Sequence, residues 1–74
     1  MNINDFKKQI YKLVDNAPNC WRRGQSVFNV IEEHYGEVAR HVQFVDGVDC
    51  FYNDSLIDTF IFKCYCYLKE RNII

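Results

Sequence analysis

The chain has 74 residues, which leaves room for a single domain spanning 1–74 with a modest hydrophobic core. Hydrophobic residues make up 49% of the chain and charged residues 26%, proportions that exclude an intrinsically disordered protein. The formal net charge of −1 at pH 7 excludes a general nucleic-acid-binding protein, which depends on a strongly positive surface.

A first helix is predicted at about 5–15. Apolar residues recur there at helical spacing, which gives the helix one apolar stripe. Asn4 is expected to cap its start, and Asn16 is expected to end it in the left-handed conformation. The stripe consists of Phe6, Ile10, Leu13 and Val14.

A second helix is predicted at about 21–35, with Asn19 or a neighbouring residue as its cap and Gly36 as its terminator. Gly24 lies inside this helix, where glycine costs about 1 kcal/mol relative to alanine. The close approach of another backbone, or of a ligand, would explain a glycine at this position.

The second half of the chain has a less regular pattern. Residues 37–52 permit a short helix or an irregular loop, and Phe44 is expected to begin a turn. A last helix is predicted at about 55–70, with Ser55 opening a capping box. The chain should therefore form a small all-α domain of three main helices.

The last helix has more aromatic residues than one packed face can cover. Aromatic side chains outside the packed face often mark an interface. We therefore expect the protein to form a homo-oligomer through this helix. The expected interface residues are Phe62, Tyr65 and Cys66.

No signal peptide is expected, because residues 1–5 have neither a basic region nor an apolar stretch, and none of the apolar runs approaches 18 residues. A cytoplasmic location without membrane contact is therefore expected. Its cysteines lack the spacing of a metal site, and they are expected to be reduced, buried and structural. No metal or cofactor is expected. The four cysteines are Cys20, Cys50, Cys64 and Cys66.

The near-neutral total conceals an uneven charge distribution. Residues 1–25 carry a net charge of +3, residues 26–58 carry −6, and residues 59–74 carry +2. Two interpretations are open. Neighbouring elements of one molecule complement each other, or the basic end of one copy faces the acidic middle of the next.

The start of the second predicted helix is the most informative segment. Two arginines in a first helical turn oppose the helix dipole, and an anionic partner would reverse this penalty. Guanidinium, amide and aromatic groups together suit a planar ligand that carries phosphate, such as a nucleotide. The candidate ligand-binding residues are Trp21, Arg22, Arg23, Gln25, Asn29 and Tyr52.

A structural role for the same residues is the alternative. Arg23 would then pair with an acid of the 46–58 segment, and Gln25 and Asn29 would fasten that loop. The candidate loop partners are Asp49 and Asp54. Catalysis is not expected, because neither histidine lies beside an obvious nucleophile and no catalytic motif is present.

Segments at 21–25, 28–29 and 49–54 resemble a group of small uncharacterised bacterial and phage proteins. Their shared pattern is W-R-x-G-Q, then F-N, then D-P-F-Y-x-D, and Cys50 replaces its proline here. The resemblance implies no settled activity. The polar positions that match it are Arg23, Gln25, Asn29, Asp49, Tyr52 and Asp54.

These features lead to two functional hypotheses. The first is a non-enzymatic phage-type protein that binds an anionic small molecule, for example to sequester a nucleotide immune signal in the host cytoplasm. The second is a protein-interaction module that inhibits or adapts a host protein through the aromatic face of the last helix.

Overall fold

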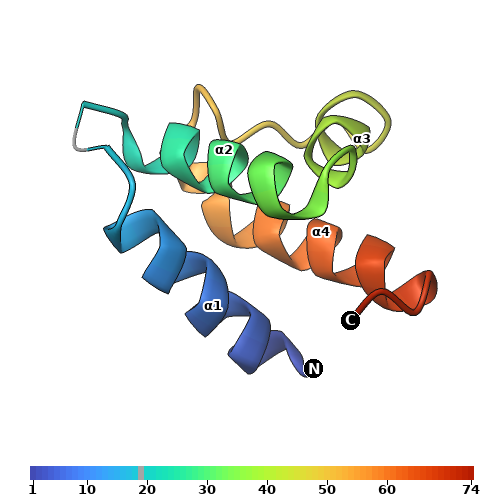
Figure 1. The fold of residues 1–74 in the computed structure, drawn as a ribbon. Helices are drawn as coiled ribbons and strands as arrows, with labels where there is room; N and C mark the ends of the chain where they lie inside the picture. Colours follow the sequence, from blue (N-terminus) through green and yellow to red (C-terminus); the bar gives the residue numbers. More distant parts are fainter. Residues whose placement is uncertain (19) are drawn as a thin grey trace.

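The computed structural model describes residues 1–18 and 20–74, and within these ranges the protein is all-α, as predicted. Four α-helices and one 3₁₀ turn are present, and no strand is found in this part of the chain. The elements are α1 (Ile3–Asp15), α2 (Arg23–Tyr35), α3 (Val38–Phe44), η1 (Asp54–Leu56) and α4 (Ile57–Glu70) (Figure 1). The segment left open at 37–52 is therefore a short helix followed by a loop.

The three longer helices pack side by side. Figure 1 shows α1 running opposite to α2 and α4, with α3 at the far end of α2. The chain termini lie near each other because α4 ends beside the N-terminus. Met1 O accepts hydrogen bonds from Tyr65 Oη at 3.1 Å and from Lys69 Nζ at 3.2 Å.

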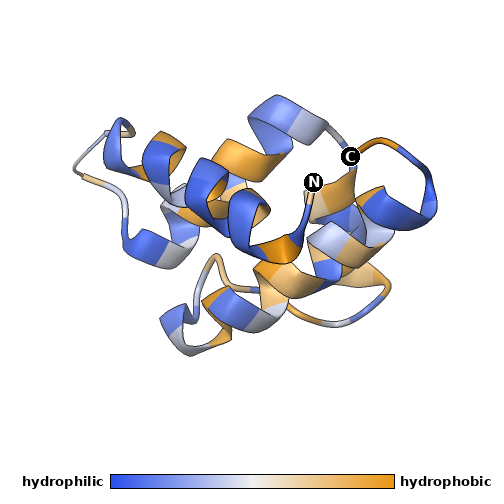
Figure 2. Ribbon diagram, turned by 90° about the horizontal axis from the view of Figure 1, so that it is seen from below, coloured by the Kyte–Doolittle hydropathy of each residue, from blue (hydrophilic) through white to orange (hydrophobic). Residues whose placement is uncertain are grey.

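Buried apolar side chains from all four α-helices and from Cys50 form one core. Phe28 packs on Phe60 in this core, with ring centroids 5.6 Å apart, and Phe6 packs on Tyr35 at 5.7 Å. Figure 2 shows hydrophobic and hydrophilic residues on each of the longer helices, as amphipathic packing requires. The largest fully buried side chains are Phe6, Phe60, Ile10, Ile31, Ile61 and Leu68.

The boundaries of α1 differ from the prediction at its start. The helix begins at Ile3 because Asn2, rather than Asn4, caps it, and Asn2 Oδ1 accepts from the Asp5 amide at 2.8 Å. Its predicted end at Asp15 agrees with the structure. Asn16 does not adopt the expected left-handed conformation, since its φ is −97°, and its side-chain amide donates to Lys12 O instead.

The later boundaries also shift. The second helix begins at Arg23 rather than residue 21, and the expected cap at Asn19 lies outside the described residues. Gly36 ends that helix as predicted, with φ at +71°. Phe44 is the last residue of α3 rather than the start of a turn. Ser55 is not the cap of the last helix, because Asn53 Oδ1 accepts from Ser55 N and caps the preceding 3₁₀ turn.

Candidate functional site

The loop before η1 lies directly against the first turn of α2. Cys50 Sγ donates a hydrogen bond to Gly24 O at 3.3 Å, and Gly24 N donates to Asp54 Oδ1 at 3.0 Å. A methyl group on Gly24 would collide with the carbonyl oxygen of Cys50. The glycine inside this helix predicted the close approach of a backbone or of a ligand. The group that lies against Gly24 is the backbone of the loop.

Asp54 supplies the cap that α2 lacks locally. Arg22 occupies the N-cap position in an extended conformation, and its side chain makes no capping hydrogen bond. The Asp54 carboxylate takes this place by accepting from Gly24 N. Its negative charge also lies at the positive end of the helix dipole, which stabilises a helix by about 0.3–1 kcal/mol.

Contacts of Arg22 and of Asp49 also fasten the same loop. Arg22 Nη2 donates to Phe51 O at 2.6 Å, and its guanidinium carbon lies 5.9 Å from the ring centroid of Tyr52. Asp49 accepts from the amide of Phe51 at 2.9 Å and from Gln43 Nε2 at 3.0 Å. We call the contacts of Arg22, Gly24, Cys50, Phe51 and Asp54 the loop clasp.

The loop clasp differs from the fastening expected from the sequence. No ion pair joins Arg23 to Asp49 or Asp54, since the ion pairs among the described residues are Arg40–Glu32 and Arg71–Glu70. Arg23 instead lies over the ring of Tyr11, with its guanidinium carbon 4.9 Å from the centroid. Arg22 is the extended N-cap residue and Arg23 is the first helical residue, and their side chains take different directions: Arg22 reaches the loop and Arg23 reaches α1.

The six candidate ligand-binding residues do not surround one cavity. Trp21 and Arg23 line a hollow of about 250 Å³ between the end of α1 and the start of α2. Tyr52 lines a different hollow beside α3. Among the hollows found in residues 1–18 and 20–74, none is lined by the other three candidates, which are Arg22, Gln25 and Asn29.

Four of the seven residues that line the hollow beside Tyr52 are aromatic. It has a volume of about 190 Å³ and lies between α2, the end of α3 and the loop clasp. Phe28 meets Phe51 edge to face there, with centroids 5.5 Å apart, and Phe51 meets Tyr52 at 4.7 Å. We call this hollow the aromatic depression. It is lined by Phe28, Glu32, Arg40, Gln43, Phe44, Phe51 and Tyr52.

Two of the side chains that line the aromatic depression project into solvent. Phe44 is 77% exposed and Tyr52 is 72% exposed, although both side chains are large and mostly apolar. Val45, which follows in the chain, is 69% exposed. The sequence pattern did not identify Phe44 as a surface residue. Its exposure could have been predicted from helical spacing, because Phe44 falls on the face of α3 nearly opposite the buried Val38, Ala39 and Val42.

The three residues expected at an oligomer interface have different environments. Phe62 is 51% exposed on α4. Tyr65 is half-buried because its ring packs on Phe6 with centroids 5.8 Å apart and its hydroxyl donates to Met1 O. Cys66 is also half-buried, and it lines a polar hollow of about 230 Å³ near His41 and Arg71.

The four cysteines are free thiols, as expected, but only two are buried. Burial, together with the smaller effect of the Asp49 charge, raises the pKa of the Cys50 thiol to about 12. Burial likewise raises the pKa of Cys64. Cys20 is exposed, which corrects the expectation that all four thiols are buried.

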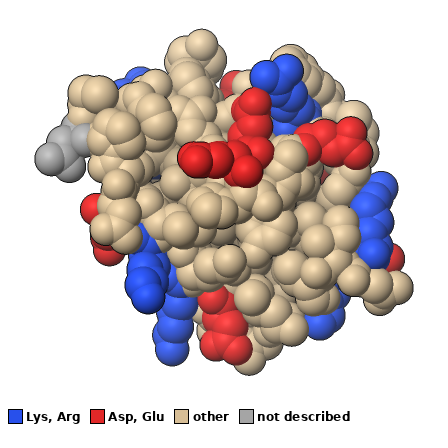
Figure 3. Space-filling model, viewed as in Figure 1, with Lys and Arg blue, Asp and Glu red and all other residues tan. Residues whose placement is uncertain are grey.

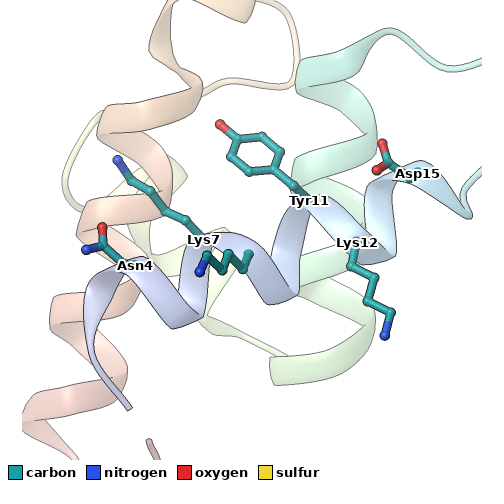
Figure 4. A pocket seen from close by; sticks show the side chains of 6 residues that line it. Asn4, Lys7, Tyr11, Lys12 and Asp15 are labelled. Carbon is teal, nitrogen blue, oxygen red and sulfur yellow. The ribbon is translucent and has the colours of Figure 1, made fainter.

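The largest hollow of the described surface lies along α1 and has a volume of about 550 Å³. All its residues come from this one helix, so it is an outward-facing trough and not an enclosed pocket. Figure 4 shows its labelled side chains spreading outward from the helix without converging on one point. The trough is lined by Asn4, Lys7, Lys8, Tyr11, Lys12 and Asp15.

Charged side chains of both signs lie on the face of the molecule seen in Figure 3. Acidic side chains gather at its upper centre beside a basic group, and basic side chains gather at its lower left beside an acidic group. Within residues 1–18 and 20–74, no three His, Cys, Asp or Glu side chains are grouped as a metal site would require. No helix of this part of the chain is both long enough and apolar enough to cross a bilayer.

Comparisons of the chain with protein-family models, curated proteins and solved structures found no match. The resemblance to small bacterial and phage proteins therefore stays a prediction. Geometry, charge and exposure within this one molecule must support any functional assignment.

Proposed function

We propose that this protein is a non-catalytic interaction module that binds a partner protein through the aromatic depression. The observation that carries the proposal is the exposure of Phe44 and Tyr52 on the two sides of one hollow. Aromatic side chains that project beside a hollow are typical of the few residues that dominate binding energy at protein interfaces.

The size of the aromatic depression favours a protein partner over a small-molecule ligand. Its volume of about 190 Å³ lies below the roughly 300–1,000 Å³ of typical small-molecule pockets. A hollow of this size suits one large apolar side chain from a partner surface. Phe28 and Phe51 supply its apolar lining, while Arg40 and Glu32 supply a polar rim.

The loop clasp prepares this surface for binding. It fixes Phe51 through its carbonyl group and places Arg22 beside the ring of Tyr52. A surface that is already ordered loses less conformational entropy when a partner binds. Arg22, one of the residues that suggested a ligand site, thus supports the residues that line the aromatic depression.

Peptide selection tests this proposal, because a random library samples many partner sequences at once. We expect selection from a random peptide display library on the wild-type protein to recover sequences that share a large apolar residue. The substitutions Phe44→Ser and Tyr52→Ser should each weaken binding of these peptides by at least about tenfold, or about 1.4 kcal/mol. Both side chains are exposed, so circular dichroism should show an unchanged fold.

Phe62→Ser is the matched control, because Phe62 is also an exposed phenylalanine but lies on α4. It should leave peptide binding unchanged. Peptides that bind the Phe44→Ser and Tyr52→Ser proteins as tightly as the wild type would refute the aromatic depression as the docking surface. Loss of binding on Phe62→Ser alone would instead favour the aromatic face of α4.

An anionic small molecule is a second candidate partner, and one observation favours it. Arg23 covers Tyr11, and the lysines of the α1 trough surround the same tyrosine. A nucleotide immune signal would be one ligand of this charge. Calorimetry at low salt with a panel of nucleotides tests the idea. Arg23→Ala should weaken any binding, whereas Lys63→Ala, at an exposed cation on α4, should not, and the absence of wild-type binding refutes it.

A further inference from the structure

Building on the proposed function, we infer that the partner seated on the aromatic depression is a second copy of this chain. The two copies would be related by a two-fold axis, so each presents the same surface to the other. Such an interface requires a surface that is complementary to itself. The aromatic depression meets this requirement in its shape and in its charge.

Shape complementarity follows from the position of Phe44. Its side chain projects into solvent at one edge of a hollow of about 190 Å³, so a protruding group and a receiving hollow lie side by side. A two-fold axis between them would place each Phe44 over the hollow of the other copy. Val45 and Tyr52 would extend the apolar contact around it.

Charge complementarity follows from the rim. Arg40 Nη2 lies 3.0 Å from Glu32 Oε1, so the rim carries one positive and one negative group. The Arg40 side chain is 65% exposed and the Glu32 side chain 34% exposed, which leaves both accessible to a facing copy. A two-fold axis would bring Arg40 of each copy toward Glu32 of the other. A purely acidic or purely basic partner would lack this match.

None of the other large exposed apolar side chains lines a hollow found in the described residues. The other large exposed apolar side chains are Phe62 on α4, Met1 at the N-terminus and Ile73 near the C-terminus. Monomeric proteins expose single apolar residues commonly, whereas grouped ones mark an interface. The self-docking surface is therefore placed at α3 and the loop clasp, and not on the face of α4 that the sequence favoured.

Analytical ultracentrifugation across a concentration series provides the first test. We expect the wild type to sediment as a dimer at high concentration and to dissociate on dilution. Phe44→Ser should raise the dimer dissociation constant at least tenfold, and Phe62→Ser should leave it unchanged. Wild-type protein that remains monomeric at about 1 mM would overturn the inference.

Charge exchange between copies gives the second and sharper test. Arg40→Glu places two acids at the rim, and Glu32→Arg places two bases there, so each variant alone should dimerise at least about fivefold more weakly. A 1:1 mixture should regain association, because unlike copies then meet with opposite charges at both contacts. Neither variant can restore its own internal pair, so this recovery can come only from contact between copies.

The outcomes separate this inference from the proposed function. A monomeric wild type that still binds selected peptides through Phe44 would overturn self-docking and keep the interaction module. A mixture of Arg40→Glu and Glu32→Arg that associates no better than either variant alone would also overturn self-docking. If Phe44→Ser changes neither dimerisation nor peptide binding, both proposals fail.

Discussion

The loop before η1 has a buried inner side and an exposed outer side, and residues only two positions apart lie on opposite sides. Cys50 points inward, is fully buried and donates to Gly24 O, whereas Tyr52 is 72% exposed only two positions later. The inner side tolerates no additional atom at Gly24. The outer side leaves an aromatic ring in solvent. Arg22 and Gly24 therefore hold the loop from its inner side, while the surface proposed for binding lies on its outer side.

The first prediction tests the tightness of the inner side. Gly24→Ala should lower the free energy of unfolding by about 3 kcal/mol, because its methyl group would collide with the Cys50 carbonyl and move the loop or α2. The higher helix propensity of alanine offsets only about 1 kcal/mol of such a clash. Urea unfolding followed by circular dichroism measures the change. Gln25→Ala, at the next helical position, should change stability by less than about 0.5 kcal/mol.

The second prediction concerns the protonated thiol on the inner side. The pKa of Cys50 is raised to about 12 in the folded protein, so the unfolded chain loses this proton first as pH rises. Because the folded protein holds this proton more tightly, the protonated thiol contributes its full stabilisation below about pH 9. This contribution to the free energy of unfolding is lost between about pH 9 and pH 12. Between pH 8 and pH 10, the ionisation of Cys50 in the unfolded chain should lower the free energy of unfolding by about 1.4 kcal/mol. Cys64, whose pKa is also raised, should add to this loss.

Thermal unfolding at a series of pH values measures this effect. Cys50→Ala should show a shallower fall in Tm above pH 9 than the wild type, whatever its stability at pH 8. Iodoacetamide labelling provides an independent readout, since exposed Cys20 should react in the folded protein and buried Cys50 should not. Equal pH slopes for the variant and the wild type would contradict the prediction.

The third prediction concerns the cap that the loop supplies to α2. Asp54→Ala should lower the free energy of unfolding by about 1–2 kcal/mol, because Gly24 N loses its acceptor and the helix loses a favourable charge. Asp54→Asn keeps an acceptor oxygen and should cost less. Asp46→Ala, at an exposed acid in the turn after α3, is the control and should be nearly neutral. Equal effects at Asp54 and Asp46 would rule out the capping role.

The fourth and smallest effect connects the two sides of the loop. Arg22→Ala should cost about 1 kcal/mol by removing the hydrogen bond to Phe51 O and the contact with Tyr52. Hydrogen exchange of the Asn53 amide, which donates to Cys50 O, should accelerate. Arg23→Ala should leave that exchange rate unchanged, because Arg23 contacts Tyr11 instead. If both variants accelerate exchange equally, Arg22 has no specific role in the loop clasp.

Local sequence patterns predicted the helices better than their exact boundaries. The stripe of Phe6, Ile10 and Val14 is buried as expected, because helical spacing alone places these residues on one face. The start of α1 was misplaced because Asn2 and Asn4 are both suitable caps in sequence. The conformation of the preceding backbone selects between them, and residue type does not reveal it.

The candidate site was harder to predict because its contacts span distant positions. The need for a close neighbour at Gly24 was inferred from helix propensity, but Cys50 is 26 residues away and Asp54 is 30. The sequence pattern singled out the arginine pair and the acids of the loop, but it predicted an ion pair of Arg23 with a loop acid. In the structure Asp54 accepts from Gly24 N, and Arg22 rather than Arg23 binds the loop. The direction of Arg23 depends on how α2 is rotated against its neighbours, and that of Arg22 depends on the extended backbone before the helix; both are decided by packing.

The chain by itself determined an all-α fold, the position of each longer helix and the existence of a tight contact at Gly24, since these follow from periodicity and local backbone preference. Only the tertiary structure decided which aromatic side chains the core could hold. Tyr65 packs on Phe6 and donates a hydrogen bond to Met1 O, whereas Phe44 and Tyr52 are exposed. The reason is geometric. A core this small is filled by the residues that the helix packing directs inward, and Phe44 and Tyr52, which it directs outward, line the surface proposed here for binding.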